Sequence, residues 1–463
     1  MSSLSQSMPL SVTTHSSNAS LSSLSSGVGS GSGVSTPTAS ALSLSTASLL
    51  KKAAYHGAED RIVLDIGSFS CKVGLSWEPT PRRTYIPGVA EKKLGCANGF
   101  HTSPFRVEHQ SLSVHTEFLG SLLRTIFHHI LLTDVKHKQI VVCESLFVSI
   151  EFKQTLAEIL FYKFSAKSIS FVPASFAALL ATGQTIGLVL DCGYQEACAL
   201  SIYGSLPLIA CSKSVPLAGY HVSKRLKELV CQYGHIVNNT LGTSSIEVSS
   251  HDHHQVVDIL QKASDTFWET LKATIVVAYP TRKDWQSHHT STCKNDSVHD
   301  EADTSAYYDV TIDSFNVVRI PTWVGYVAAD VLFEGNEEGE TLQGCLLDTL
   351  LKCHVTTRLE LIQNILLCGG TCSIPGLEDR LRYEMQHLAD EHSNLKSARK
   401  LVSKINFIYS PFQPSQQAWV GGSLIGSVKI KTKFEITRED FIKHKTVPDW
   451  SRIHLLQEPD PSS

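Results

Sequence analysis

Several features that would assign this chain to a simple class are missing from its sequence. No uninterrupted apolar run is long enough to cross a bilayer as a helix. None of the 12 cysteines stands in a C-x-x-C pair, so the spacing of zinc ribbons and thioredoxin-like redox sites is absent. A net charge of −4 gives no broad attraction to nucleic acid or anionic membranes. We therefore expect reduced cysteines, no nucleic-acid partner and no direct membrane insertion.

The beginning of the chain has very little charge. No charged residue occurs before Lys51, and Ser, Thr, Gly and Ala dominate up to residue 58. A secretory signal needs a basic start and a mitochondrial transit peptide needs arginines, so neither is indicated. Such a segment buries too little apolar surface to offset the entropy lost on ordering. We expect residues 1–58 to be a disordered Ser/Thr/Gly-rich tail, and residues 446–463 to be an irregular tail.

The stretch from Arg61 to Leu75 organises the rest of the chain. An apolar, β-branched run ends in Asp65, Gly67 and Ser68 follow, and a second run leads through Lys72. This pattern predicts a strand, a tight turn and a returning strand. The turn presents backbone N–H groups, a carboxylate, a hydroxyl and an ammonium, which are the groups that suit a phosphate and its metal.

The same pattern occurs a second time. Val189-Leu190-Asp191-Cys192-Gly193 repeats the V-L-D-x-G order, and an alternating strand over 197–203 follows it. Two copies about one domain length apart predict a duplicated α/β fold with a cleft between the halves.

Two glycine-containing runs follow later in the chain. Residues 364–376, NILLCGGTCSIPG, predict a strand, a glycine turn and a helix from about residue 377. Residues 418–427 open another helix whose adjacent glycines permit close helix approach. Periodicity also predicts the following elements: helices over 118–132, 151–164, 174–182, about 220–233, 256–273 and 342–351, and strands over 139–144, 168–172, 307–312 and 405–409.

These motifs, in this order, resemble the actin family within the actin/hexokinase/Hsp70 superfamily. The resemblance covers about residues 60–445 and rests on the two hairpins, on Leu367-Cys-Gly-Gly-Thr371 and on Trp419-Val-Gly-Gly-Ser423. It implies duplicated ribonuclease H-like domains around a nucleotide cleft. Within the family, Val141-Val-Cys-Glu-Ser145 and Leu190-Asp-Cys-Gly-Tyr-Gln-Glu196 resemble the actin-related subfamily at the pointed end of dynactin.

Membership of this family would imply ATP with Mg²⁺. Asp65 would hold metal-bound water, Ser68 would reach a terminal phosphate and Lys72 would neutralise charge. The resemblance assigns cofactor binding to Asp65, Gly67, Ser68, Lys72, Asp191, Gly193, Gly369, Gly370 and Thr371.

The chain departs from the actin pattern at the positions that perform hydrolysis. Phe69 replaces a small Gly, Tyr194 and Gln195 replace an Asp and a Gly, and Ala174 replaces the Gln that positions water. Losing a metal carboxylate and a water-positioning group together should cost several orders of magnitude in rate. We expect no catalytic residues, no dedicated protein metal site and, at most, ATP with Mg²⁺ as a structural ligand that is not hydrolysed.

One further pair maps less securely. The Lys-Glu pair that actins place beside adenine falls on Leu260 and Gln261 in this chain.

The resemblance also divides the chain. We expect a first half at 59–182 with a reduced outer subdomain at 83–106, and a second half at 183–400 with a divergent outer subdomain at 223–313. Residues 401–445 would return to the first half, and a polar insertion would occupy 284–309. In this family the outer subdomain grips the next protomer at the pointed end. A molecule with this subdomain reduced could dock on a filament end and offer no site for further addition.

Three functions remain open on the sequence alone. The first is a non-catalytic dynactin subunit in the cytoplasm and cytoskeleton, with filament actin-related protein and pointed-end subunits as partners, and dynein and microtubules as indirect ones. The second is an actin-related subunit of a nuclear chromatin-remodelling complex. The third is an active ATPase or sugar-kinase-like enzyme, against which Ala174, Tyr194 and Gln195 count.

Overall fold

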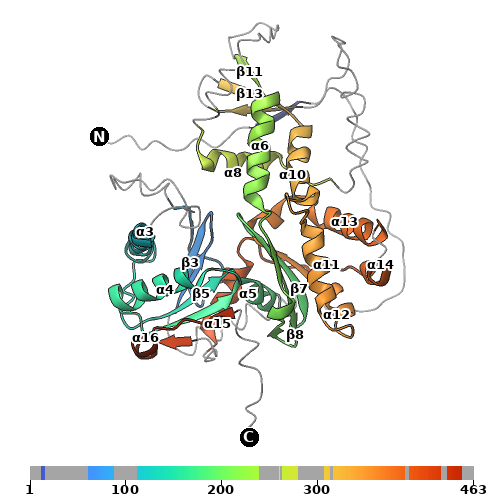
Figure 1. Cartoon of the computed structure of the whole chain (residues 1–463). Helices are drawn as coiled ribbons and strands as arrows, with labels where there is room; N and C mark the ends of the chain where they lie inside the picture. Colours follow the sequence, from blue (N-terminus) through green and yellow to red (C-terminus); the bar gives the residue numbers. More distant parts are fainter. Residues whose placement is uncertain are drawn as a thin grey trace, which may run out of the picture. The chain divides into compact units, whose positions relative to one another are not determined.

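The chain divides into two compact units, and each is described by itself. Unit 1 comprises residues 1–35, 220–341 and 374–384, and unit 2 comprises residues 36–219, 342–373 and 385–463. No helix in the described part of the chain is long and apolar enough to span a membrane. The computed structural model (Figure 1) describes residues 12–15, 61–87, 112–238, 260, 263–279, 307–312, 316–391, 396–428 and 435–450.

The first Asp-containing hairpin lies in a six-stranded sheet of unit 2, with the order β15-β6-β5-β2-β3-β4. β2, β5 and β6 are parallel, whereas β2, β3 and β4 form an antiparallel meander. The parallel strands are almost entirely buried, and Val, Ile and Leu predominate in β2 and β5, as expected for strands covered on both faces. The strands are β2 (Ile62–Ile66), β3 (Cys71–Leu75), β4 (Arg83–Tyr85), β5 (Gln139–Glu144), β6 (Ser168–Pro173) and β15 (Glu435–Thr437).

The second Asp-containing hairpin lies in another sheet of unit 2, with the order β10-β8-β7-β14 and with β9 paired to β8. Here too an antiparallel hairpin, β7–β8, has a parallel neighbour, β14, on its first strand. The recurrence of this arrangement confirms the duplicated α/β fold. The strands are β7 (Gly187–Cys192), β8 (Ala197–Tyr203), β9 (Leu206–Pro207), β10 (Lys213–Val215) and β14 (Ile365–Cys368).

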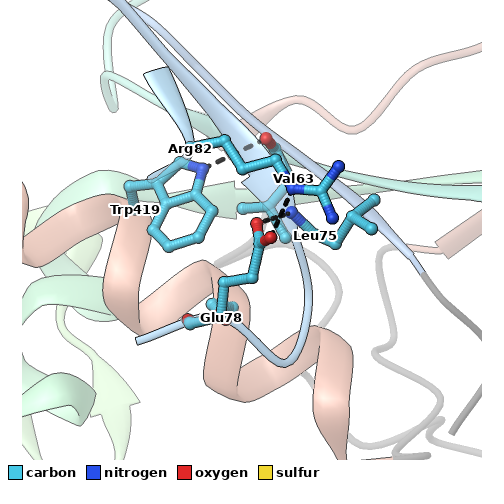
Figure 2. Close-up of polar contacts among 6 residues, drawn as sticks. Val63, Leu75, Glu78, Arg82 and Trp419 are labelled. Atoms are coloured by element: carbon cyan, nitrogen blue, oxygen red, sulfur yellow. Dashed lines mark hydrogen bonds and ion pairs between the residues drawn. The ribbon is translucent and has the colours of Figure 1, made fainter. Parts of the chain in front are cut away.

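Helices α5 (Ala174–Ala181) and α15 (Gln417–Ser427) pack against each other on the first sheet. A Cβ atom added at Gly421 would lie 1.8 Å from the carbonyl oxygen of Ala177, so the two helices meet at backbone distance. The Trp419 indole N–H donates to the Val63 carbonyl oxygen over 3.1 Å and fixes α15 to β2 (Figure 2). In the same view Glu78 accepts hydrogen bonds from the Leu75 N–H and the Arg82 guanidinium.

The other helices of unit 2 flank the two sheets (Figure 1). α3 and α4 each continue into a π-helical segment, over Thr125–Ile130 and Ile159–Lys163. α11 packs on β7, β8 and β10. The bounds are α3 (Leu112–Arg124), α4 (Ile150–Glu158), α11 (Leu342–Lys352), α12 (Arg358–Ile362), α14 (Lys396–Val402) and α16 (Arg438–His444), with 3₁₀ turns at Ile209–Cys211 and Gly370–Ser373.

The last described residues are anchored in unit 2. Trp450 is 3% exposed, and its indole N–H donates to Glu144 over 2.5 Å. Lys153, which is also buried, forms an ion pair with Glu144 at 2.7 Å and donates to the Pro448 carbonyl oxygen. Its ammonium lies over the Trp450 ring, 5.2 Å from the centroid. Within the predicted irregular tail, the part up to residue 450 is therefore ordered against the core.

Unit 1 is built on a four-stranded antiparallel sheet with the order β1-β12-β13-β11. Beside it, buried Arg380 donates to Asp330 at 2.8 Å and to Glu384 at 2.7 Å, which ties the start of α13 to α10. The elements are β1 (Val12–His15), β11 (His235–Asn238), β12 (Tyr307–Thr311), β13 (Asn316–Pro321), α6 (Gly219–Tyr233), α8 (Asp265–Ile275) and α10 (Trp323–Glu334). α13 (Leu377–Glu391) begins in this unit.

The structure departs from the sequence expectations at three places. Val12–His15, expected to be disordered, form a strand because β12 offers its edge as a partner. The strand expected over 405–409 is absent; Phe407 makes only an isolated parallel bridge to Ile365. The helix expected over 256–273 is described as α8, from Asp265. Most of the expected outer subdomain at 83–106 and of the insertion at 284–309 lies outside the described residues.

Candidate functional site

The first loop of the site is the turn between β2 and β3. The Gly67 N–H donates to the Ser70 carbonyl oxygen over 3.2 Å and closes the turn. Asp65 and Lys72 are directly opposite each other in the antiparallel register, and their side chains form an ion pair at 3.3 Å. Both side chains are 13% exposed, so the turn holds a partly shielded carboxylate and ammonium.

The second loop is the turn between β7 and β8. The Gly193 N–H donates to the Glu196 carbonyl oxygen over 3.0 Å, in the same way that Gly67 closes the first turn. Asp191 stands at the corresponding position on β7, one residue before the end of the strand. The two Asp-x-Gly turns therefore have equivalent local structure as well as equivalent sequence.

The glycine turn after β14 packs directly on the second loop. β14 runs parallel to β7, with Cys368 opposite Asp191. The Thr371 hydroxyl donates to the Gly193 carbonyl oxygen over 2.6 Å. Gly369 has φ = 89°, and a Cβ there would lie 2.3 Å from the Cys192 carbonyl oxygen, so only glycine fits. A Cβ at Gly370 would meet nothing within 4 Å, so open space remains beside this turn.

The two carboxylates interact electrostatically. Burial raises the pKa of Asp191 to about 6, the negative charge of Asp65 adds to this rise and Lys72 opposes it. Burial lowers the pKa of Lys72, but the attraction of Asp65 outweighs burial and the pKa lies above its usual value. Two carboxylates thus share one ammonium, which leaves a site with an excess of negative charge near neutral pH.

The loop tips carry aromatic side chains in contact. The rings of Phe69 and Tyr194 have centroids 5.1 Å apart and planes inclined by 31°. Phe69 directly follows Ser68 in the first loop, and Tyr194 directly follows Gly193 in the second. The ring pair therefore joins the two turns that the resemblance assigns to phosphate binding. Ala174 begins α5 and is 7% exposed. Its methyl group cannot orient a water molecule.

Glu196 is a polar group of the site that the sequence reasoning did not assign. Its carboxylate accepts from the Ser145 hydroxyl over 2.5 Å and from the Ser214 hydroxyl over 3.2 Å. Its negative charge also raises the pKa of Asp191. The signal was visible as a carboxylate at the start of an otherwise apolar strand, but two serines distant in sequence provide its partners.

The structure brings most of the predicted site residues together in two groups. The structure places Asp65, Lys72 and Asp191 in one electrostatic group, and Gly193, Gly369 and Thr371 in one packed turn. Ser68 lies in the first loop, but the structure describes no hydrogen bond from its hydroxyl. Leu260 is buried, with 1% exposure, and Gln261 lies outside the described residues.

The carboxylates and the ammonium of the two loops suit the binding of a nucleotide with its metal better than they suit catalysis of hydrolysis. Two interacting carboxylates suit a hydrated divalent cation, because that cation would remove their mutual repulsion. The Phe69–Tyr194 pair stands at positions where the actin pattern has a permissive glycine and a metal-site carboxylate.

Comparison with known families agrees with this arrangement. The sequence model described as "Actin" matches residues 57–446, which is most of the chain.

The chain belongs to the actin family.

Two relatives show how far this actin-family chain has diverged. "Actin-related protein 10" of Dictyostelium discoideum is 24% identical over 447 residues, covering 86% of this chain and 90% of the relative. "Putative actin-29" of the same organism is 22% identical over 407 residues, covering 83% of this chain and 94% of the relative. The coverage shows that the similarity extends through both halves of the actin fold, and proteins of this family commonly bind nucleotide with Mg²⁺.

Proposed function

We propose that this chain is a non-catalytic actin-related protein that caps the pointed end of the actin-related filament of dynactin. It would link that filament to the other pointed-end subunits and so support dynein-driven transport on microtubules, in the cytoplasm and cytoskeleton. The proposal corresponds to the role of the subfamily named actin-related protein 10, or actin-related protein 11 in some animals. The similarity to "Actin-related protein 10" of Dictyostelium discoideum supports it.

The observation that carries the non-catalytic part is the Phe69–Tyr194 contact. It occupies the two loop tips at which an actin ATPase needs a close backbone approach and a second metal-site carboxylate. Ala174 removes the remaining water-positioning group. Because phosphoryl transfer depends on positioning and charge, these losses leave folding intact while removing turnover. A bound nucleotide would serve as a structural ligand that stabilises the folded state.

The capping part rests on an asymmetry within the chain. The frame of the first half is complete, since the six-stranded sheet and its helices are ordered. By resemblance, the segment from Gly74 to the strand at Val141 would contain the outer subdomain and its polymer-contacting loop, and it is shorter than in actin. A subunit of this form adds to a filament end through its intact face and leaves no site for the next protomer. Its interface should exceed about 1,000 Å².

The deciding experiment is native affinity purification from cytosol, followed by size separation and mass spectrometry. Recovery in a large assembly with filament-forming actin-related protein and dynactin subunits is expected. Recovery as a free monomer would contradict the capping role and leave only the actin fold established.

An actin-related subunit of a nuclear chromatin remodeller is the second candidate. That class shares a degraded nucleotide site, so the chemistry of the site does not separate the two. The sequence has no obvious basic localisation cluster, which favours the cytoplasm. Predominantly nuclear protein after cell fractionation, co-purifying with chromatin subunits, would replace the first proposal with this one.

A further inference from the structure

The sheet of unit 1 receives its outermost strand from the far end of the chain. Three of its strands, β11, β12 and β13, lie within residues 235–321. The fourth strand, β1, comes from residues 12–15. Without β1, β12 would be the outermost strand, and such an edge readily pairs with strands of other chains. We propose that the outer edge of β12 is a strand-binding site whose resident ligand is the chain's own segment Val12–His15.

The register gives the site its selectivity. Val12 is opposite Val310, which is opposite Val318 on β13. Val310 and Val318 are 0% and 1% exposed, so these two side chains of the row face the core. A slip of one residue would place Thr13 at the end of this row, because strand positions alternate between the two faces. We therefore expect the site to prefer an extended segment that places an apolar residue opposite Val310.

Contacts that do not involve β1 hold the acceptor strand β12 in place. Asp309 accepts two hydrogen bonds from the Arg319 guanidinium, each 2.8 Å long, which cross-link β12 to β13. The same guanidinium lies over the Tyr307 ring, 3.7 Å from its centroid. Five consecutive residue pairs between β12 and β13 hold the strand extended. Such pre-organisation lowers the entropy lost when a further strand binds.

The ligand strand is short and tethered. It contributes four residue pairs, so its own contribution to binding is modest. Residues 16–61 connect it to β2 in the same chain. Because β1 belongs to the same chain as β12, it pairs at an effective concentration of about millimolar order or below, which favours the intramolecular strand over a dilute competitor. A longer extended segment presented at high local concentration would displace it. The segment thus protects the edge and remains exchangeable.

The test uses the full-length chain and hydrogen exchange of the backbone amides of Tyr307–Val310. Thr13→Pro places a residue without an N–H inside the four-residue strand and should weaken its pairing, which would speed exchange about tenfold or more at the β12 amides that face β1. Thr13→Val keeps the ladder and is the matched control, with protection at or above that of the wild type. A synthetic peptide of residues 8–19 should restore protection in the Thr13→Pro variant and have little effect on the wild-type chain.

The possible outcomes separate clearly. Dimerisation of the Thr13→Pro variant that the peptide reverses also supports a strand-accepting edge, occupied then by a second copy. Unchanged exchange at Tyr307–Val310 in Thr13→Pro and in a deletion of residues 2–35 would overturn the proposal. The same conclusion follows if fluorescence anisotropy detects no binding of the labelled peptide to the deleted chain.

Discussion

The indole N–H of Trp419 donates a hydrogen bond to the main-chain carbonyl oxygen of Val63, 3.1 Å away and 356 positions earlier in the chain. Trp419 is 0% exposed, and its ring also fills the space beside Gly74, where a Cβ would lie 2.6 Å from it. This one side chain therefore joins α15 to both strands of the first loop (Figure 2). The loop geometry depends on a residue from the opposite end of the chain.

Two substitutions of Trp419 should lower the free energy of unfolding by different amounts. Trp419→Phe loses the hydrogen bond and some volume, for a cost of about 1–2 kcal/mol. Trp419→Ala adds a large cavity, for a cost of about 3–5 kcal/mol. Chemical denaturation measures both. Trp77→Phe is the control, because Trp77 is 39% exposed and should change the free energy of unfolding little. Equal effects of Trp419→Phe and Trp77→Phe would contradict the anchoring role.

Two glycine-to-alanine substitutions should have different effects on the free energy of unfolding. Gly421→Ala places a methyl group 1.8 Å from the Ala177 carbonyl oxygen and forces α5 and α15 apart, with a loss of roughly 2 kcal/mol or more. Gly120→Ala, inside α3, meets only the Lys163 ammonium at 3.5 Å. It should be neutral or stabilise by about 0.5–1 kcal/mol through helix propensity. Thermal unfolding of the two variants tests the difference.

The buried carboxylate of Asp191 predicts a pH dependence of stability in buffer free of metal and nucleotide. Its pKa in the folded chain is about 6, above the ordinary value of 3.8. The stability linked to this group is therefore fully present below about pH 4 and is lost as the pH rises through 6. A shift of this size corresponds to about 3 kcal/mol.

Asp191→Asn is the matched variant for this prediction. It should remove the loss and be more stable than the wild type at pH 7.5, with a smaller difference at pH 4.5. The measurement is the free energy of unfolding at both pH values. A parallel pH dependence for the two proteins would show that Asp191 is ionised without penalty.

ATP with Mg²⁺ should bind without being hydrolysed. We expect a thermal shift on binding, together with phosphate release no faster than that of the Asp65→Ala control. Phe69→Gly combined with Tyr194→Asp restores the small residue and the carboxylate at the loop tips, and should tighten nucleotide binding. If isothermal titration detects no heat and no thermal shift occurs for the wild type and the double variant, the chain does not bind the nucleotide. Phosphate release clearly above the Asp65→Ala control would instead revive the ATPase.

Deleting residues 1–58 should leave the global unfolding transition nearly unchanged, because β1 contributes only four residue pairs at one edge of unit 1. The melting temperature of the deleted chain checks this, with the full-length chain as reference. A clear loss of thermal stability would assign the segment a larger structural role than an edge strand.

Local chemistry explains which parts of the fold the sequence could predict. Both hairpins were predictable because an apolar β-branched run, an Asp and a Gly follow one another within a few residues, and the structure confirms β2–β3 and β7–β8. The helix at 174–182 was predictable because small residues end at Gly183, which adopts φ = 77°. In each case the determining interactions are close in sequence.

The predictions failed where residues distant in sequence determine the local structure. The run at 405–409 consists of β-branched and aromatic residues apart from Asn406, yet only Phe407 forms a bridge to β14. Val12–His15 lie in a polar segment without apolar periodicity, and β12 alone makes them a strand. Phe69 and Tyr194 were each singled out as departures, but only the structure shows that their rings meet. The serine partners of Glu196 were equally invisible.

The pairing of β1 with β12 has a consequence for synthesis of the chain. Val12 leaves the ribosome early, while its partner Val310 is made about 300 residues later, which takes roughly 15–60 s at common translation rates. During that interval the N-terminal segment must neither aggregate nor be captured by another nascent chain. Its scarcity of apolar runs and of charge keeps it a weak partner for other chains while it waits. A strand made long before its partner thus forms one edge of the finished sheet.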